Sequence, residues 1–478
     1  MVFLLILLAV SASLSHPLLN LNAEERTVFD NLEASPYAEE FPVSIKPFSL
    51  GRAFIMADRP DRIKTYLNAL SRPGYFLKPV NSVSFRLYYT NEEIFPLENM
   101  SGTLLRRGVN LYIFLDGYLS LGRRFVFYYQ VRSVSDRNSY RADVFRAYMK
   151  LRLWKLSLLA GKDTVHLGPG EFGLLLSSNA EPFPMISLRT EEPLNLFGKW
   201  EFIFVRGFLR EKRRDRDDPN ILALRVVYKP RDFLEIGLTR TSLYGGEGRP
   251  GYTLFEYPKL ILGVEENIPF GKFDTDGYAA YDFTLYLPLR RLLPSVRTFK
   301  VYFQRGGTDV SAWWQKDNPG DFAFPFGFRL HLRSYVAGVF LSLDKDILRL
   351  EYHDVNRAWY IHHLYPVEGY TYRGMSLGHP YGNDLKHIFL KHIHYFSDHF
   401  SAGYRFGFLR QPGEDRPGMN RFYIVLFGER RVRRLILEGF LRLDVTDNYD
   451  RDPLPNRIDI RSEDRTFITA GVGLGWRF

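Results

Sequence analysis

Histidine is the residue type in this chain that first suggests catalysis or metal binding. Two histidines separated by one residue on a strand share a face, but that spacing does not supply a third or fourth metal ligand. A hydrolase in a barrel wall would need Ser and His on neighbouring strands. We therefore predict unligated surface histidines, no catalytic residue, no metal site and no cofactor. The histidines considered are His353, His362, His363, His392, His394 and His399.

Aromatic residues beside polar or basic ones are the second chemical signal, and they fall in segments that we predict to be external loops. Aromatic rings stack on the apolar faces of sugar rings, while Arg and Asn reach hydroxyls and uronate carboxylates. The pattern predicts contacts with an anionic polysaccharide. For each ring taken singly, a place in the membrane-interface girdle is the alternative. The candidate contact residues are Trp313, Trp314, Asn356, Arg357, Trp359 and Tyr360.

Two glycine-rich loops have unusual content. The loop at residues 162–184 contains Leu174, Leu175 and Leu176, a run too apolar for a loop in free solution. We predict that it folds onto the barrel wall or into the lumen, where its glycines allow tight backbone conformations. The second loop contains the sequence Leu-Gly-His-Pro-Tyr-Gly-Asn-Asp at residues 377–384.

These two loops carry a family resemblance. Gly168-Pro169-Gly170, followed by Leu-Ser-Ser-Asn-Ala with Ser178 and Asn179, resembles the signature of the capsule-assembly Wzi family of outer-membrane barrels. Gly378, Gly382 and Asp384 match that family's later Leu-Gly-x-x-x-Gly-x-Asp element. The resemblance implies an eighteen-stranded barrel with a periplasmic helical cap. It also implies a non-catalytic lectin that holds capsular or other surface polysaccharide, without saying which residues touch sugar.

The elements that must position these loops are membrane strands, and the C-terminal strand shows this most clearly. Successive strand side chains point to opposite faces, so one face of this strand is an apolar stripe ending in two aromatics. We predict that Trp476 and Phe478 form a signal for the barrel-assembly machinery and that this strand closes the barrel. The stripe consists of Ile468, Ala470, Val472, Leu474, Trp476 and Phe478.

The connections predict the size of the barrel. Short candidate turns, such as those at residues 154–155 and 197–198, alternate with long candidate loops such as those at residues 162–184 and 356–385. Bacterial barrels have short periplasmic turns and long external loops, so this alternation predicts an all-β transmembrane barrel of about eighteen antiparallel strands over residues 81–478.

The N-terminal region differs in its periodicity. Residues 1–15 have a short apolar core followed by small residues, which predicts a signal peptide and a Gram-negative-type outer-membrane location. Residues 16–80 are expected to form a small periplasmic helical cap or plug, with helices near residues 22–36 and 58–72. No segment has the roughly 20 uninterrupted apolar residues of a membrane-spanning helix.

Composition narrows the possible partners. The net charge is +10 and the chain has no Cys, which excludes disulfide frameworks and thiolate metal sites. Basic residues alternate with aromatics instead of clustering, so nucleic acid is not expected. We expect surface polysaccharide, outer-membrane lipids and lipopolysaccharide as partners. An anion-selective or passive porin is the alternative function, and a barrel-wall hydrolase is a weaker one.

Overall fold

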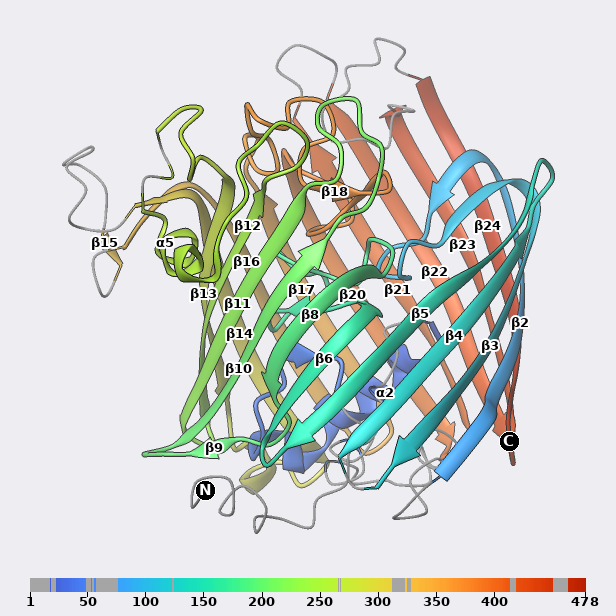
Figure 1. Cartoon of the computed structure of the whole chain (residues 1–478). Coiled ribbons are helices and arrows are strands. Elements are labelled where there is room, and N and C mark those ends of the chain that lie inside the picture. Colours follow the sequence, from blue (N-terminus) through green and yellow to red (C-terminus); the bar gives the residue numbers. More distant parts are fainter. Residues whose placement is uncertain are drawn as a thin grey trace.

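The computed structural model describes residues 18, 23–48, 53, 56, 76–122, 124–264, 266, 268–311, 323–324, 328–412, 418–449 and 463–478. Within these residues, 18 long antiparallel strands form a closed barrel (Figure 1), which confirms the predicted fold class. In chain order they are β2 (Phe76–Pro96), β3 (Leu104–Leu121), β4 (Phe125–Ser135), β5 (Tyr140–Leu153), β6 (Leu156–Asp163), β8 (Phe183–Thr190), β10 (Lys199–Phe208), β11 (Asn220–Arg231), β12 (Leu234–Tyr244), β13 (Asp276–Tyr286), β14 (Val296–Ser311), β16 (Phe328–Leu343), β17 (Asp346–Val355), β20 (Leu385–Ser397), β21 (Phe400–Gln411), β22 (Met419–Val432), β23 (Leu435–Tyr449) and β24 (Glu463–Arg477). Two-residue strands β9 (Leu194–Asn195) and β15 (Ala323–Phe324) extend the sheet.

The first and last strands close the barrel by pairing with each other. β2 and β24 are antiparallel, with Ser82 opposite Arg477 and Thr90 opposite Thr469. The predicted apolar stripe faces outward, where Val472 is 62% and Phe478 49% exposed, while Thr469 on the opposite face is fully buried. Alternation with period two therefore places apolar side chains on the lipid-facing surface and polar ones inside.

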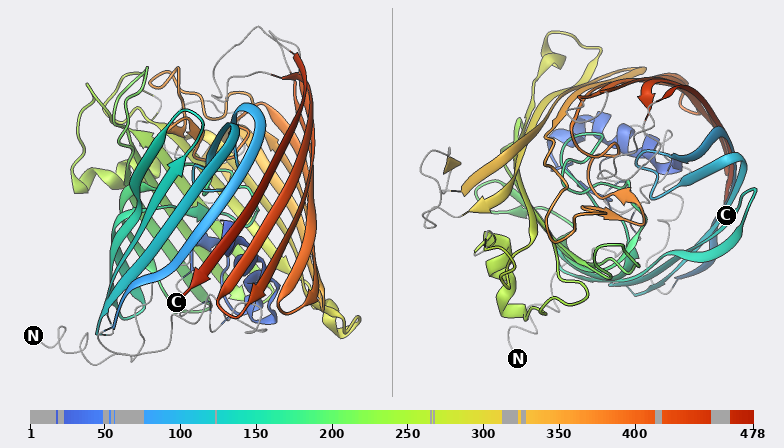
Figure 2. Two further views of the ribbon diagram at one scale, coloured as in Figure 1. Left: turned by 90° about the vertical axis from the view of Figure 1, so that its right-hand side faces the viewer. Right: turned by 90° about the horizontal axis from the view of Figure 1, so that it is seen from above.

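The predicted turns and loops lie at opposite ends of the barrel. β5 and β6 are joined by two residues and β11 and β12 also by two, whereas the connections after β6, β12 and β17 are long. Figure 2 shows the long connections at the end opposite to the C-terminus. None of the described helices is long and apolar enough to cross a membrane.

The N-terminal segment lies inside the barrel instead of only below it. Helix α2 (Ala23–Ala34) continues into a 3-10 turn, η1 (Pro36–Glu39), and the short strand β1 (Ile45–Lys46). Figure 2 shows α2 within the ring of strands. Val28, Leu32 and Phe48 pack together and reach Ile436 of the barrel wall. The predicted helix at residues 58–72 and the predicted signal peptide at residues 1–15 lie outside the described residues, and the domain boundaries at 15 and 80 stay predictions.

The long connections carry small elements of their own. The connection after β6 contains β7 (His166–Leu167), and the connection after β17 contains β18 (Thr371–Tyr372) and β19 (Met375–Ser376). The connection after β12 contains η3 (Leu254–Glu256) and α5 (Tyr257–Leu262), and η4 (Leu289–Arg291) follows β13. β1 pairs with β7, so the N-terminal segment and the first loop meet inside the lumen.

Candidate functional site

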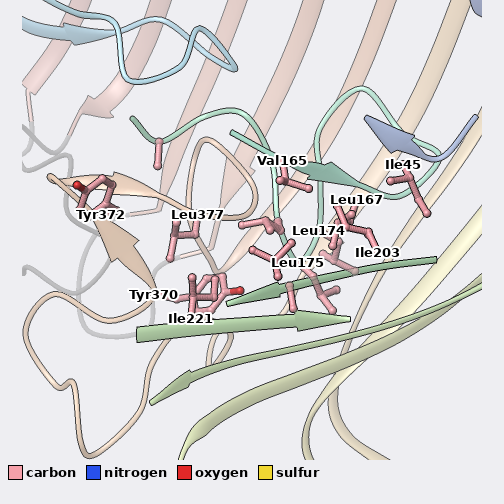
Figure 3. Close-up of a cluster of buried hydrophobic side chains, with 14 of the residues drawn as sticks. Ile45, Val165, Leu167, Leu174, Leu175, Ile203, Ile221, Tyr370, Tyr372 and Leu377 are labelled. Carbon is pink, nitrogen blue, oxygen red and sulfur yellow. The ribbon is translucent and has the colours of Figure 1, made fainter. Parts of the chain in front are cut away.

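The loop at residues 162–184 enters the lumen and forms part of its main hydrophobic cluster (Figure 3). Leu174, Leu175 and Leu176 are fully buried, as the sequence predicts. The Leu167 amide donates to the Leu176 carbonyl at 2.9 Å and the Gly168 amide to the Ser44 carbonyl at 3.0 Å. These backbone bonds satisfy polar groups that burial would otherwise leave unpaired, so the loop is a packed element.

The two motif loops are fastened to each other. The Ser177 amide donates to the Leu377 carbonyl at 2.7 Å, and the Asn179 side-chain amide donates to the Ser376 carbonyl at 3.0 Å. The Ser178 carbonyl accepts from the Ser101 amide at 2.8 Å, which ties the pair to the connection after β2. The motif residue Asn179 thus helps to join the two loops, and Ser178 fastens them to the connection after β2. We name this assembly, residues 163–182 with residues 356–384, the lid.

Gly378 belongs to the same contact. A Cβ added there would lie 2.2 Å from the Tyr360 hydroxyl, too close for any L side chain without a shift of the Tyr360 ring. The Tyr360 hydroxyl donates to the Leu174 carbonyl at 2.5 Å and accepts from the His379 amide at 2.8 Å. Glycine therefore allows Tyr360 to join both halves of the lid.

Trp359 and Tyr360 lie beneath the external surface. Trp359 packs on Tyr278 with ring centroids 5.0 Å apart, and Tyr360 stacks on Tyr370 at 5.6 Å. Both are fully buried, so a sugar contact would require the loops above them to move. Arg357 is exposed and Asn356 partly exposed beside them. Trp313 and Trp314 lie outside the described residues.

Ion pairs close the lower part of the lumen. Glu33 of α2 contacts Lys46, lies 3.0 Å from Lys300 Nζ of β14 and lies 2.7 Å from Arg349 Nη2 of β17. Burial raises the pKa of Glu33, but the cations of Lys300, Lys46 and Arg349 outweigh it and hold that pKa well below its ordinary value. Asp30 adds a 2.7 Å pair with Lys391 of β20. We name this assembly, α2 with its wall partners, the floor.

Among the described residues, a small cavity with several charged side chains lies in the lumen. It has a volume of about 100 Å³ and lies between α2, the connection after β2 and strands β20–β24. A cavity of this size holds a few water molecules. Its charged lining comprises Asp30, Glu98, Lys391, Arg405, Glu429, Glu438 and Arg442.

A larger cleft opens at the external rim, between the loop at residues 209–219 and the loop that carries α5. Its volume is about 480 Å³. The α5 loop folds over the outer face of β12, where Arg240 Nη2 contacts both Glu266 carboxylate oxygens at 2.7 Å. The cleft therefore lies on the outward side of the rim. Its aromatic and charged lining is Arg206, Arg210, Lys212, Asp217, Asp218, Tyr244, Glu247, Arg249, Tyr252 and Tyr257.

The charges of this cleft are unbalanced. Lys212 pairs with Asp217 at 2.5 Å and Arg210 with Asp218 at 3.7 Å, whereas no carboxylate of the described residues pairs with Arg206 or Arg249. Arg249 donates to three backbone carbonyls, those of Phe270, Gly271 and Asp274. The sequence does not reveal this cleft, because its arginines come from a strand and two separate loops.

One serine has the spacing of a hydrolase motif. Gly374-Met375-Ser376-Leu377-Gly378 fits Gly-x-Ser-x-Gly. Ser376 is buried on β19 instead of standing at an exposed turn between strand and helix, and its hydroxyl accepts from the Gly378 amide at 3.2 Å. This environment gives the hydroxyl a structural partner and does not form a nucleophile elbow.

The prediction of surface histidines is partly wrong. His399 is exposed, but His353 is fully buried on the inner face of β17. The physical reason is strand alternation, because His353 shares the inward face with Arg349 and Glu351.

Comparisons with known proteins agree with this architecture. A family model described as capsule assembly protein Wzi matches residues 89–416. The structure of Escherichia coli Wzi, an outer-membrane, carbohydrate-binding β-barrel involved in group 1 capsule assembly, matches with a TM-score of 0.69 and 17% identity, covering 98% of this chain and 100% of that one. Pseudomonas aeruginosa OccD3 (OpdP) matches with a TM-score of 0.50 and 11% identity, covering 86% of this chain and 96% of that one. Comparison with curated proteins finds no match. At these identities the structural likeness shows the fold.

Proposed function

Because the chain belongs to the capsule assembly protein Wzi family, we propose that it is an outer-membrane, lectin-like protein that attaches or organises surface polysaccharide without catalysing a reaction on it. The family and the lipid-facing barrel support the outer-membrane location. The carbohydrate binding named for the Escherichia coli protein supports the ligand class.

The observation that carries the ligand proposal is the external cleft. Arg206 and Arg249 lack carboxylate partners among the described residues, so an acidic saccharide would supply the missing charge. Arg forms bidentate bonds with carboxylates and phosphates, and Tyr252 offers a half-buried ring for stacking on a sugar face. Asp217, Asp218 and Glu247 would accept bonds from hydroxyls. This combination favours an anionic polysaccharide over a neutral one.

The contact residues predicted from sequence remain part of the proposal. Arg357 and Asn356 are accessible at the lid surface, and Trp313 and Trp314 are proposed as further external contacts. Trp359 and Tyr360 are proposed to act by supporting the lid surface from below, because both rings are buried.

The filled lumen supports binding instead of passive transport. The lid and the floor both occupy the barrel interior and meet through Glu171, which pairs with Lys391 and Arg349, and the cavity between α2 and β20–β24 is only about 100 Å³. An open porin would need a continuous aqueous path through the barrel.

Assembly partners follow from the fold. We propose that residues 1–15 direct export and that Trp476 and Phe478 are read by the barrel-assembly machinery, with lipids and lipopolysaccharide around the finished barrel. Deleting Phe478 should reduce the fraction of protein showing heat-modifiable gel migration, because its amide bonds the Asn81 carbonyl at the β2–β24 closure. Normal migration of that variant would contradict this role.

The test of the ligand proposal is binding to an array of uronate-containing and neutral polysaccharides. We expect wild type to prefer acidic chains. The variant Arg206→Gln/Arg249→Gln/Tyr252→Ala should lose at least about tenfold in affinity, because each contact contributes on the order of 1 to 3 kcal/mol. A second variant, Trp313→Ala/Trp314→Ala/Trp359→Ala, tests whether the three tryptophans predicted from sequence contribute to polysaccharide affinity.

The matched control replaces two aromatics that lie away from the external loops. Trp200 and Tyr228 stack at 4.2 Å near the short turns, so Trp200→Ala/Tyr228→Ala should bind like wild type. Undiminished binding by the folded cleft variant would overturn the cleft assignment. Absence of any polysaccharide binding by wild type would overturn the lectin proposal itself.

A further inference from the structure

Three histidines converge beneath the lid, inside the barrel. His353 of β17 and His387 of β20 are direct partners across adjacent strands and face the lumen, while His379 comes from the lid loop before β20. All three are fully buried, and one ring nitrogen of each lies within 4.8 Å of the other two. The cluster therefore joins the wall to the lid.

Each ring has one nitrogen with no hydrogen-bond partner among the described residues. These atoms are Nδ1 of His353, Nε2 of His379 and Nδ1 of His387. The other nitrogens of the two wall histidines are engaged: Nε2 of His353 lies 2.9 Å from a Glu351 oxygen, and Nε2 of His387 lies 3.1 Å from the Tyr423 hydroxyl. Buried polar atoms without partners are uncommon, because each costs about 1 to 3 kcal/mol.

The surroundings resemble the second shell of a metal site. A carboxylate that accepts from the far nitrogen of an imidazole fixes its tautomer and leaves the near nitrogen free to bind metal. Glu351 has this position toward His353, and it also accepts the lid amide of Glu171 at 2.7 Å. Phe172 of the lid packs on all three imidazoles, with centroids 5.3 to 5.6 Å away. The Phe172 ring therefore covers one side of the three imidazoles, and hydrogen bonds with Glu351 and Tyr423 orient two of them.

We propose that His353, His379 and His387 bind one divalent transition-metal ion that pins the lid to the barrel wall. Imidazole nitrogens suit zinc, copper and nickel, and the chain has no thiolate to compete. Zinc–nitrogen bonds of about 2.0 to 2.1 Å place tetrahedral ligand nitrogens about 3.3 Å apart, so the three rings, whose nitrogens lie within 4.8 Å of one another, must move closer together on binding. A water molecule would complete the coordination.

Metal binding would break one hydrogen bond of the site, and a water molecule could occupy the same position as the metal ion. The Tyr381 amide lies 3.3 Å from Nδ1 of His379, and this long contact is lost when Nε2 binds metal and Nδ1 carries the proton. The competitor is a water molecule that accepts from His379 and donates to the two wall histidines. The proposal concerns the closed lumen and does not depend on the polysaccharide.

The experiment loads the full mature chain, purified in detergent and stripped with chelator, with Co²⁺ or Zn²⁺. We expect one ion per chain by elemental analysis, visible Co²⁺ absorption of a low-coordinate nitrogen site, and a higher unfolding temperature with Zn²⁺. His379→Gln, which changes a lid residue and leaves the wall strands intact, should weaken binding at least tenfold. His387→Gln should do the same.

The control is His362→Gln/His363→Gln. These residues form a separate, more exposed group with Asp274, with His363 Nε2 at 2.8 Å from its carboxylate. This variant should bind as wild type does. Absence of stoichiometric metal in wild type would assign the three nitrogens to a water molecule. Metal binding unchanged in His379→Gln, or lost in His362→Gln/His363→Gln, would also overturn the proposal.

Discussion

The floor and the lid close the same lumen by different chemistry. In the floor, the Glu33 carboxylate of α2 pairs with Lys46, Lys300 and Arg349. In the lid, Leu174 to Leu176 are buried, and backbone bonds such as that from the Ser177 amide to the Leu377 carbonyl join its halves. The floor therefore depends more on charge pairing, and the lid depends more on apolar burial with satisfied backbone groups, although each contains contacts of the other kind.

This difference determines which perturbations each closure withstands. A buried ion pair contributes little net stability when intact, but removing one partner is costly because the remaining charges stay buried. The apolar contacts of the lid do not depend on charge, although its Glu171 and Glu181 pair with Lys391 and Arg132, and the lid loses stability when a buried neutral group must become charged. Substitutions away from Glu171, which pairs with Lys391 and Arg349 of the floor, should therefore act mainly on one closure, and pH should act on the two closures over different ranges.

The largest effect should follow removal of the lid segment 168–179. This deletion removes Leu174 to Leu176 and the bonds to residues 376–378, leaving α2 in place. We expect liposomes containing the variant to become permeable to small sugars, with a further increase when Glu33→Gln also loosens the floor. Permeability equal to wild type in a folded variant would show that the lid does not close the lumen.

The second effect concerns the floor. Glu33→Gln removes the carboxylate that pairs with Lys46 and Lys300, while Arg349 keeps Glu351 and Glu171 as partners, and it should lower stability by roughly 3 to 5 kcal/mol. The control is Glu93→Gln, which breaks an ion pair with Arg107 whose side chains are 64% and 61% exposed, a change of about 0 to 1 kcal/mol. Denaturant unfolding in detergent measures both. Equal effects of the two substitutions would contradict the charge-dependent floor.

The third prediction is that the lid and the floor lose stability over different pH ranges. Burial and then the Lys46 cation lower the pKa of His166 to about 3, against the opposing effects of the Gly170 carbonyl, Glu171 and Glu33. A solvated His titrates near about 6.5, so the lid should lose about 1.4 kcal/mol per pH unit as pH falls below that value toward 3.

As pH falls, the floor should lose stability at a lower pH than the lid does. The pKa of Glu33 is held below its ordinary value, so its contribution is complete above about 4.3 and is lost only as pH falls through the folded-state pKa. Hydrogen exchange, corrected for intrinsic rates, should show the Leu167 amide opening at pH 5 while α2 stays protected. His166→Gln should reduce this pH dependence, and the remainder is expected from His379 of the lid, whose pKa burial also lowers. Simultaneous opening of both regions would contradict the distinction.

The barrel could be predicted from sequence because its strands and turns are determined by residues that are close together in the chain. Alternation with period two places Val472, Leu474 and Trp476 outward, and short turns such as Trp154–Lys155 separate strands that pair with their neighbours. The burial of Leu174 to Leu176 was also predictable, because no exposed loop tolerates that run.

The lumen contents were harder to predict because they depend on long-range pairing. Trp359 is buried, although its neighbours Asn356 and Arg357 suit an exposed loop, since aromatic loops that fold inward have the same composition as sugar-binding ones. The histidine cluster joins His353, His379 and His387 only through strand register and lid docking. Neither relation is visible in residue spacing.

Planar-bilayer conductance of the wild-type protein at neutral pH tests the central claim, that floor and lid together close this barrel, most directly. With both closures in place, we expect each inserted barrel to show little or no steady current, and deletion of residues 168–179 to raise it. A large, steady conductance from wild type would contradict the closed lumen and favour a porin.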